Sequence, residues 1–167
     1  RGTLIPPPED LAADLYELTQ VVLAEAGFEA YEVSNHARGA AARSVHNLAY
    51  WRGWDYVGAG PGAHGRLTLG GQRHATETAA RIGAYIAARE TPAEILSPAE
   101  AALERLLMGI RSVEGVTLTD LAALSLPRAR LMSLQDEGLI DIANEVLRAT
   151  SKGRPVLDSI TRALAGV

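Results

Sequence analysis

A break in hydrophobic periodicity over residues 34–71 divides this chain into two differently patterned parts and limits the folds open to it. Before the break, apolar residues recur at helical spacing and predict a helix that ends at Gly27. Its apolar face is formed by Leu11, Leu15, Leu18 and Val22. Residues 28–33 then alternate and favour a short strand. A helix followed closely by a strand is typical of parallel-sheet α/β folds.

After the break, residues 76–90 predict a helix that is capped by Thr76 and broken by Pro92. We place a domain boundary there, between residues 1–92 and 93–167. Ser97-Pro98-Ala99-Glu100 predicts the start of the next helix, because it is a capping box with proline at the first helical position. The further expected elements are helices over 120–124 and 127–137, strands over 139–143 and 146–150, and a last helix over 152–164. This order predicts a small winged-helix-like α+β domain.

Composition excludes several functions. The chain has 167 residues, a net charge of -4 and no cysteine, so it forms no disulfide and supplies no thiolate to a metal or an iron–sulfur cluster. From Gly115 onward six basic residues are balanced by six acidic ones. The basic face of a DNA-binding winged helix is therefore missing, and we expect no nucleic-acid partner. No signal peptide or transmembrane segment is recognisable, which predicts a cytoplasmic protein.

The irregular segment is where we expect ligand binding. Residues 31–65 hold three of the four histidines, both tryptophans, and Arg38, Arg43 and Arg52. A chain that is acidic overall is locally basic here. Arginine forks pair with carboxylates, and tryptophan and tyrosine rings offer stacking faces, so the composition suits an anionic, flat ligand.

Two strings within this segment each have two interpretations. His46 could ligate heme iron axially with Tyr50 or Trp51 against the macrocycle. Alternatively, it is a partly buried histidine bonded to a carbonyl, and Trp51 is a core anchor. The glycines of residues 58–63 either let the backbone approach a ligand closely or form a turn at a sheet edge. We interpret residues 34–71 as a long functional loop that contains both strings.

Three strings carry a family resemblance by their order and spacing. They are Tyr31-Glu32-Val33-Ser34-Asn35, Ser44-Val45-His46-Asn47-Leu48-Ala49-Tyr50-Trp51 and Tyr56-Val57-Gly58-Ala59-Gly60-Pro61-Gly62-Ala63-His64. They resemble the C-terminal half of the radical S-adenosylmethionine proteins related to oxygen-independent coproporphyrinogen III oxidase (HemN). Within that family they look most like the heme-chaperone branch (HemW). The resemblance covers essentially the whole chain.

The resemblance implies a fold and two cofactors. Residues 1–92 would supply the last units of a partial (β/α) barrel, with the winged-helix-like domain after them. The family holds a [4Fe–4S] cluster on an N-terminal CxxxCxxC motif and uses it to cleave S-adenosylmethionine. That motif is absent here. The resemblance therefore implies a fragment that lacks the N-terminal half of the barrel and is inactive as an enzyme by itself.

The resemblance also implies site residues and a function. It assigns heme binding to His46, Asn47, Tyr50 and Trp51, with His46 as the iron ligand. It assigns the edge of the S-adenosylmethionine site to Gly60, Gly62, Ala63 and His64. The expected function is heme binding of the chaperone type. The alternatives are coproporphyrinogen III dehydrogenation, in which a 5′-deoxyadenosyl radical drives the oxidative decarboxylation of propionates, and a DNA-binding regulator built on the winged-helix-like domain.

Overall fold

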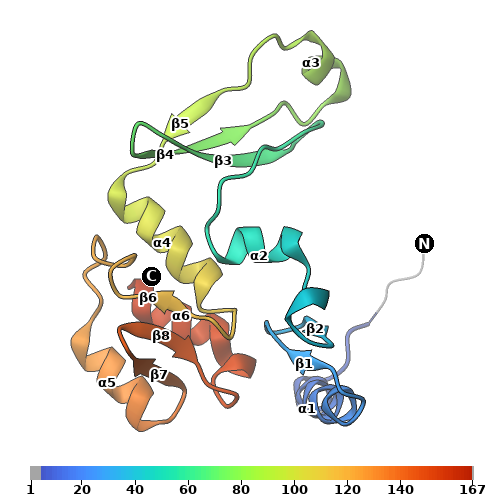
Figure 1. Ribbon diagram of the computed structural model, residues 1–167, viewed down its shortest axis with the longest axis vertical. Coiled ribbons are helices and arrows are strands. Elements are labelled where there is room, and N and C mark those ends of the chain that lie inside the picture. Colours follow the sequence, from blue (N-terminus) through green and yellow to red (C-terminus); the bar gives the residue numbers. More distant parts are fainter. Residues whose placement is uncertain (1–4, 167) are drawn as a thin grey trace.

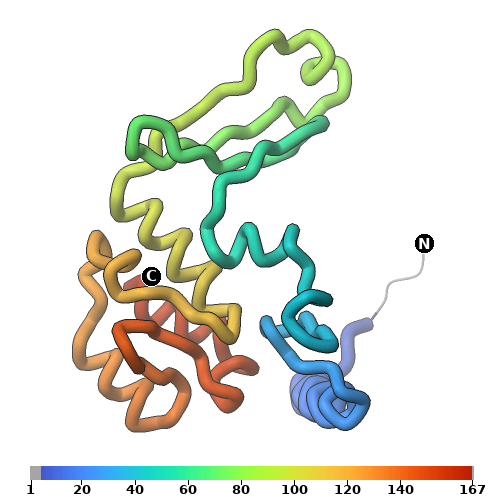
Figure 2. The backbone as a smooth tube through the Cα atoms, viewed as in Figure 1, coloured from blue at the N-terminus to red at the C-terminus, as the bar shows by residue number. Residues whose placement is uncertain are grey.

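The computed structural model describes residues 5–166 as a mixed α/β protein of three lobes, joined by two central helices (Figure 1). The first lobe holds α1 (Glu9–Glu25), β1 (Glu29–Ala30), β2 (His36–Ala37) and the 3-10 turn η1 (Ala40–Ala42). The chain then enters α2 (Val45–Trp51), passes through a lobe built on a β-hairpin, and returns through α4 (Pro98–Gly109), as Figure 2 shows.

The middle lobe is a three-stranded antiparallel sheet with a short helix at its far end. It contains β3 (His64–Leu69), β4 (Gln72–Glu77), α3 (Ile82–Ala87) and β5 (Ala93–Ile95). The strand order is β3-β4-β5, so β3 is an edge strand. Because β5 lies just beyond residue 92 and pairs with β4, the strand pairing of this sheet continues across the predicted domain boundary.

The C-terminal lobe has the largest apolar core. After α4 come β6 (Val116–Thr117), α5 (Arg128–Asp136), β7 (Ile140–Ala143), β8 (Val146–Ala149), η2 (Arg154–Val156) and α6 (Leu157–Ala165). The sheet order is β6-β8-β7 and both pairings are antiparallel. Helices α4, α5 and α6 bury apolar side chains against this sheet, including Leu106, Leu134 and Ile160. Burial of this area stabilises the lobe by the hydrophobic effect.

Several predictions for this lobe are confirmed. Ser97 accepts a hydrogen bond from the Glu100 amide and the Glu100 carboxylate accepts one from the Ser97 amide, which completes the predicted capping box. Gly138 follows α5 with a φ of 70°, the left-handed conformation that glycine adopts without strain. The hairpin turns at Asn144 and Glu145.

Other predictions are wrong. Residues 120–124 form turns and not a helix, and the last α-helix begins at Leu157 after a 3-10 turn. Residues 76–90 are not one helix, because Thr76 pairs with Gly65 in the β3–β4 hairpin. Only the Ile82–Ala87 portion is helical. Cross-strand pairing outweighs the local helical preference of the segment.

The N-terminal lobe differs most from the sequence prediction. Helix α1 forms as predicted, but none of its residues is buried, and its predicted apolar face is about half exposed to solvent. The predicted strand over 28–33 is reduced to β1, which pairs antiparallel with β2. All strand pairings within residues 5–166 are antiparallel, so the described structure contains no parallel βαβ unit.

The helices of residues 5–166 include none that is long and apolar enough to cross a membrane.

Candidate functional site

The predicted heme string lies on a helix and not in a loop, which corrects the interpretation of residues 34–71 as irregular throughout. Ser44 caps α2 by accepting a hydrogen bond from the Asn47 amide. Leu48 and Trp51 are three residues apart and both are buried, so one face of α2 packs inward. Helical spacing therefore separates the four predicted heme residues into two pairs.

His46 and Tyr50 form the outer pair. His46 is exposed, and its imidazole meets the Tyr50 ring edge to face, with 4.8 Å between centroids and 82° between planes. Tyr50 in turn meets Tyr56, whose centroid is 4.5 Å away. Burial raises the pKa of the Tyr56 phenol, and the nearby Arg66 opposes that rise. His46, Tyr50 and Tyr56 thus form a row of edge-to-face aromatic contacts, the aromatic step, which begins at the exposed His46 imidazole.

Asn47 and Trp51 form the inner pair. The Asn47 side-chain amide donates to Asn35 Oδ1 (3.2 Å). Trp51 is 9% exposed and packs edge to face on Tyr31, at 5.9 Å between centroids. The structure therefore gives Trp51 the role of a core anchor, one of the two interpretations that the sequence left open. Its assignment and that of Asn47 to heme stay predictions.

The glycine string forms a turn that leads into the edge strand β3. Gly58 packs so closely that an added Cβ would lie 2.3 Å from the His64 carbonyl oxygen. Three amides of the turn donate within the chain: Gly60 to the Tyr85 hydroxyl (3.3 Å), Gly62 to the Ala79 carbonyl (3.1 Å) and Ala63 to Thr78 Oγ1 (2.8 Å). These amides already have partners, and His64 is exposed at the start of β3. The assignment of this string to S-adenosylmethionine stays a prediction.

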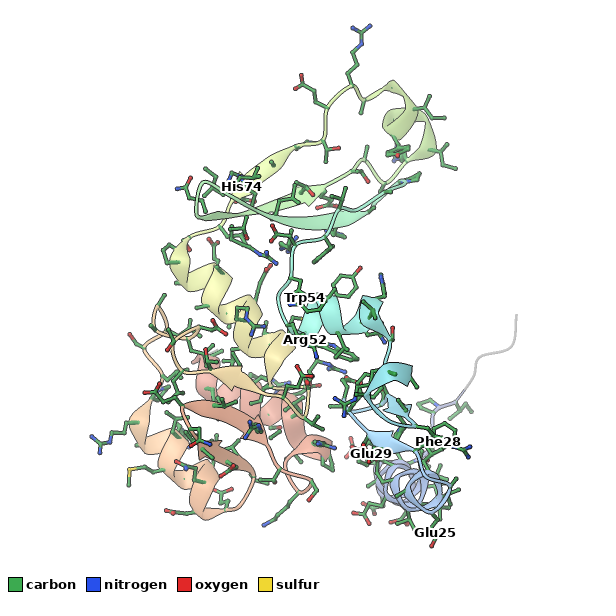
Figure 3. All side chains as sticks on the ribbon, viewed as in Figure 1. Glu25, Phe28, Glu29, Arg52, Trp54 and His74 are labelled. Atoms are coloured by element: carbon green, nitrogen blue, oxygen red, sulfur yellow. The ribbon has the colours of Figure 1, made fainter. Side chains whose placement is uncertain are left out.

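The structure brings together an arginine cluster of which sequence analysis had singled out only Arg52. Between α2, the β3–β4 hairpin and α4 lies a cavity of about 310 Å³ whose lining includes Arg52, Arg66, Arg73 and Arg105. The Arg52 guanidinium lies 5.1 Å from the Trp54 ring centroid, and Figure 3 shows both side chains between α2 and α4. A local excess of arginine was visible in the sequence, but Arg66, Arg73 and Arg105 come from three different elements.

A buried carboxylate joins the N-terminal lobe to the C-terminal lobe. Glu32 is 0% exposed and accepts hydrogen bonds from Arg111 (2.7 and 3.0 Å), Asn35 and Ser34. Burial acts to raise the pKa of Glu32, but the hydrogen bonds from Asn35, Ser34 and Arg111 outweigh it and hold the pKa below its usual range. The Arg111 partner lies 79 residues away, so spacing alone could not identify it.

No group of three or more metal-binding side chains (His, Cys, Asp or Glu) comes together within residues 5–166. His36 bonds to Gln20 of α1 (3.0 Å).

The sequence also matches known proteins. Residues 96–156 match the family model of the HemN C-terminal domain. Over nearly its whole length the chain is also similar to curated heme chaperones and radical S-adenosyl methionine domain-containing proteins. It is 37% identical to the heme chaperone HemW of Mycobacterium tuberculosis over 99% of this chain and 42% of that protein. It is 35% identical to the mitochondrial radical S-adenosyl methionine domain-containing protein 1 of Bos taurus, over 98% of this chain and 41% of that protein.

These matches confirm the resemblance to radical S-adenosylmethionine proteins of the HemN and HemW type. The chain spans about two fifths of the length of these curated relatives. Among solved structures, coproporphyrinogen III oxidase (HemN) from Escherichia coli aligns with a TM-score of 0.66 over 95% of this chain and 42% of that one. Its 14% identity supports a shared HemN-like fold and no more.

Proposed function

We propose that this chain is the heme-binding, C-terminal part of a HemW-type heme chaperone, in which heme is cargo. One observation carries the proposal: the exposed imidazole of His46 on a capped helix, with the aromatic step of Tyr50 and Tyr56 beside it. The HemW relatives, similar over nearly the whole chain, supply the heme chemistry that this geometry suits.

The outer pair offers the groups that a heme would need. The exposed His46 imidazole would hold the iron through a ring nitrogen, and the Tyr50 ring, at 82° to the imidazole, would offer an aromatic face for stacking. Asn47 and Trp51 would act from beneath, by holding α2 against Tyr31 and Asn35.

The iron–sulfur cluster of the family is held by cysteine thiolates, and this chain contains no cysteine. We therefore propose no catalytic role for its residues in the cleavage of S-adenosylmethionine. The partnered amides of the glycine turn do not fit a role as hydrogen-bond donors to S-adenosylmethionine. We propose only that Gly60, Gly62, Ala63 and His64 border that site by shape in a longer radical S-adenosylmethionine protein. In such a protein residues 1–92 would take the partial-barrel role and residues 93–167 the winged-helix-like role, and β5 of the second part would complete the sheet of the first.

Hemin titration tests the proposal directly. Hemin added to the chain should give a shifted Soret band, and His46→Ala should remove the shift. His74→Ala is the matched control, because His74 lies on strand β4, in the middle lobe, away from α2 (Figure 3). If hemin gives the same shifted Soret band with His46→Ala as with the unmodified chain, His46 is not the iron ligand.

Coproporphyrinogen III dehydrogenation is the alternative, and a fold shared with HemN does not distinguish it from heme carriage. The decisive measurement uses a cluster-loaded protein that includes this chain. Oxidation of coproporphyrinogen III by that protein would replace the chaperone proposal with the enzymatic one.

A further inference from the structure

A series of hydrogen bonds, which we call the side-chain relay, runs from the C-terminal lobe to the first turn of α2. Its first link is the pair in which Arg111 donates to Glu32 Oε1 (2.7 and 3.0 Å). In the second link the Asn35 side-chain amide donates to Glu32 Oε2 (2.7 Å). In the third the Asn47 side-chain amide donates to Asn35 Oδ1 (3.2 Å). Because Asn47 directly follows His46, the relay ends beside the proposed heme ligand.

The Glu32 carboxylate fixes the direction of the relay. Burial of Glu32 acts to raise its pKa, but the hydrogen bonds that it accepts outweigh burial and hold the pKa below its usual range. The carboxylate is therefore charged at neutral pH, and it accepts hydrogen bonds at both oxygens. For this reason the amide nitrogen of Asn35 faces Glu32, and its oxygen faces Asn47. Asn35 thus has one favoured orientation, and in that orientation it binds α2.

Backbone contacts also anchor Asn35 to the C-terminal lobe. The Asn35 carbonyl accepts a hydrogen bond from the Tyr31 amide (3.0 Å), which closes a tight turn. The Val113 amide donates to the Tyr31 carbonyl (3.2 Å), and Glu32 forms an antiparallel bridge with Ser112. The turn that carries Asn35 therefore pairs with the segment just after α4, so Asn35 ties α2 to the C-terminal lobe.

Helix α2 depends on such contacts because it is only seven residues long. A helix this short is not stable by itself in water, so tertiary contacts must set its direction. Its C-terminal end is held by the buried Trp51 ring. Its N-terminal end is held by Asn35 and by the Tyr31 hydroxyl, which accepts a hydrogen bond from the Ser44 amide (3.1 Å). Loss of Asn35 should therefore loosen the end of α2 that carries His46.

We propose that Asn35 is a positioning residue of the heme site, which fixes the direction in which α2 presents the His46 imidazole to iron. The inference rests on the proposed function, because it takes His46 as the ligand of heme iron. Asn35 acts through Asn47 and needs no contact with heme itself. Residues that orient a metal ligand from outside the coordination sphere commonly change metal affinity by about tenfold or more.

Hemin titration of four proteins tests this role: the unmodified chain, Asn35→Ala, His46→Ala and the double variant. Asn35→Ala should lower the affinity for hemin about tenfold and move the Soret band of the saturated complex toward that of His46→Ala. In the double variant the loss of Asn35 should have no further effect, because the imidazole that it positions is gone. A purely structural role would instead lower the affinity by the same factor with and without His46.

Gln20→Ala is the matched control, because the Gln20 side chain bonds to His36 (3.0 Å) within the N-terminal lobe and is not part of the relay. It should leave the hemin affinity and the Soret band unchanged. If Asn35→Ala behaves like Gln20→Ala, or costs the same affinity with and without His46, the inference is wrong. Circular dichroism should show that Asn35→Ala keeps its helix content, and a loss would contradict a role in positioning alone.

The same titrations distinguish failure of the inference from failure of the proposed function. If the Soret band depends on His46 but not on Asn35, heme binding stands and Asn35 does not position the ligand. If the Soret band is the same with and without His46, the iron has another ligand and both proposals fall.

Discussion

The C-terminal and N-terminal lobes are stabilised in different ways. Between α4 and α6, buried apolar side chains form one continuous core. In the N-terminal lobe and α2 the buried cluster consists only of Tyr31, Ala37, Leu48 and Trp51, and α1 contributes nothing to it. The C-terminal lobe thus has the apolar burial that a stable domain needs.

In the N-terminal lobe and α2, ion pairs with the C-terminal lobe supplement the small apolar cluster. Glu32 is held by Arg111, and Arg52 of the α2 C-terminus is held by Glu114 (2.7 Å). Both partners lie just after α4. Charge-assisted hydrogen bonds to the C-terminal lobe therefore position the predicted heme string. Because these bonds need ionised carboxylates, the position of the string depends on pH, whereas the apolar C-terminal core does not.

The largest expected effect is in the C-terminal core. Leu106 is 0% exposed, so Leu106→Ala should lower the free energy of unfolding by about 3 kcal/mol through lost burial and a cavity. Leu107, 40% exposed on the same helix, is the matched control, and Leu107→Ala should cost about 0.5 kcal/mol. Urea denaturation measures both, and equal losses would contradict the burial of Leu106 in the C-terminal core on which the comparison depends.

Removing the buried carboxylate should loosen the N-terminal lobe. Glu32→Gln replaces charge-assisted hydrogen bonds with weaker ones and should cost about 2 kcal/mol. Hydrogen exchange should accelerate in residues 29–51 and stay unchanged in the interior of α4. Glu29→Gln, an exposed neighbour on β1, is the control and should leave both regions as they are. Faster exchange throughout the chain would show that the two lobes unfold as one unit.

Acid should also destabilise the N-terminal lobe more than the C-terminal lobe, with a smaller effect than Glu32→Gln. Hydrogen bonds lower the pKa of Glu32 despite its burial, and the Arg52 hydrogen bond lowers that of Glu114. A lowered pKa in the folded state stabilises the fold above the unfolded value, near 4.5, and this stability is lost as pH falls through the folded value. Thermal unfolding between pH 7 and pH 3 should show a loss that Glu32→Gln reduces. An equal loss in that variant would assign the pH dependence elsewhere.

The smallest effect is expected on α1. Leu18 is 58% exposed, so Leu18→Gln should change the free energy of unfolding by less than about 0.5 kcal/mol. Leu48→Ala, at a position only 6% exposed in the small N-terminal cluster, should cost more. A large loss for Leu18→Gln would mean that α1 buries its apolar face in solution, for example against a second copy.

Local rules made much of the fold predictable. Capping by Ser97 and Glu100, the stop at Gly138 and the hairpin at residues 144–145 depend on neighbours within a few residues, and all three are confirmed. The resemblance was also readable from three short strings, and the matches to HemW relatives over nearly the whole chain and to the HemN C-terminal domain confirm it.

Tertiary structure decided the rest, because the deciding contacts are remote in sequence. Residues 76–77 became a strand because β3 was available to pair with them. Trp51 is a core anchor because it packs on Tyr31, and Glu32 is held by Arg111, which lies 79 residues further along the chain. The sequence by itself named His46 and Tyr50 as candidate heme residues. Only the fold placed them on the outer face of α2, beside a pocket whose arginines come from separate elements.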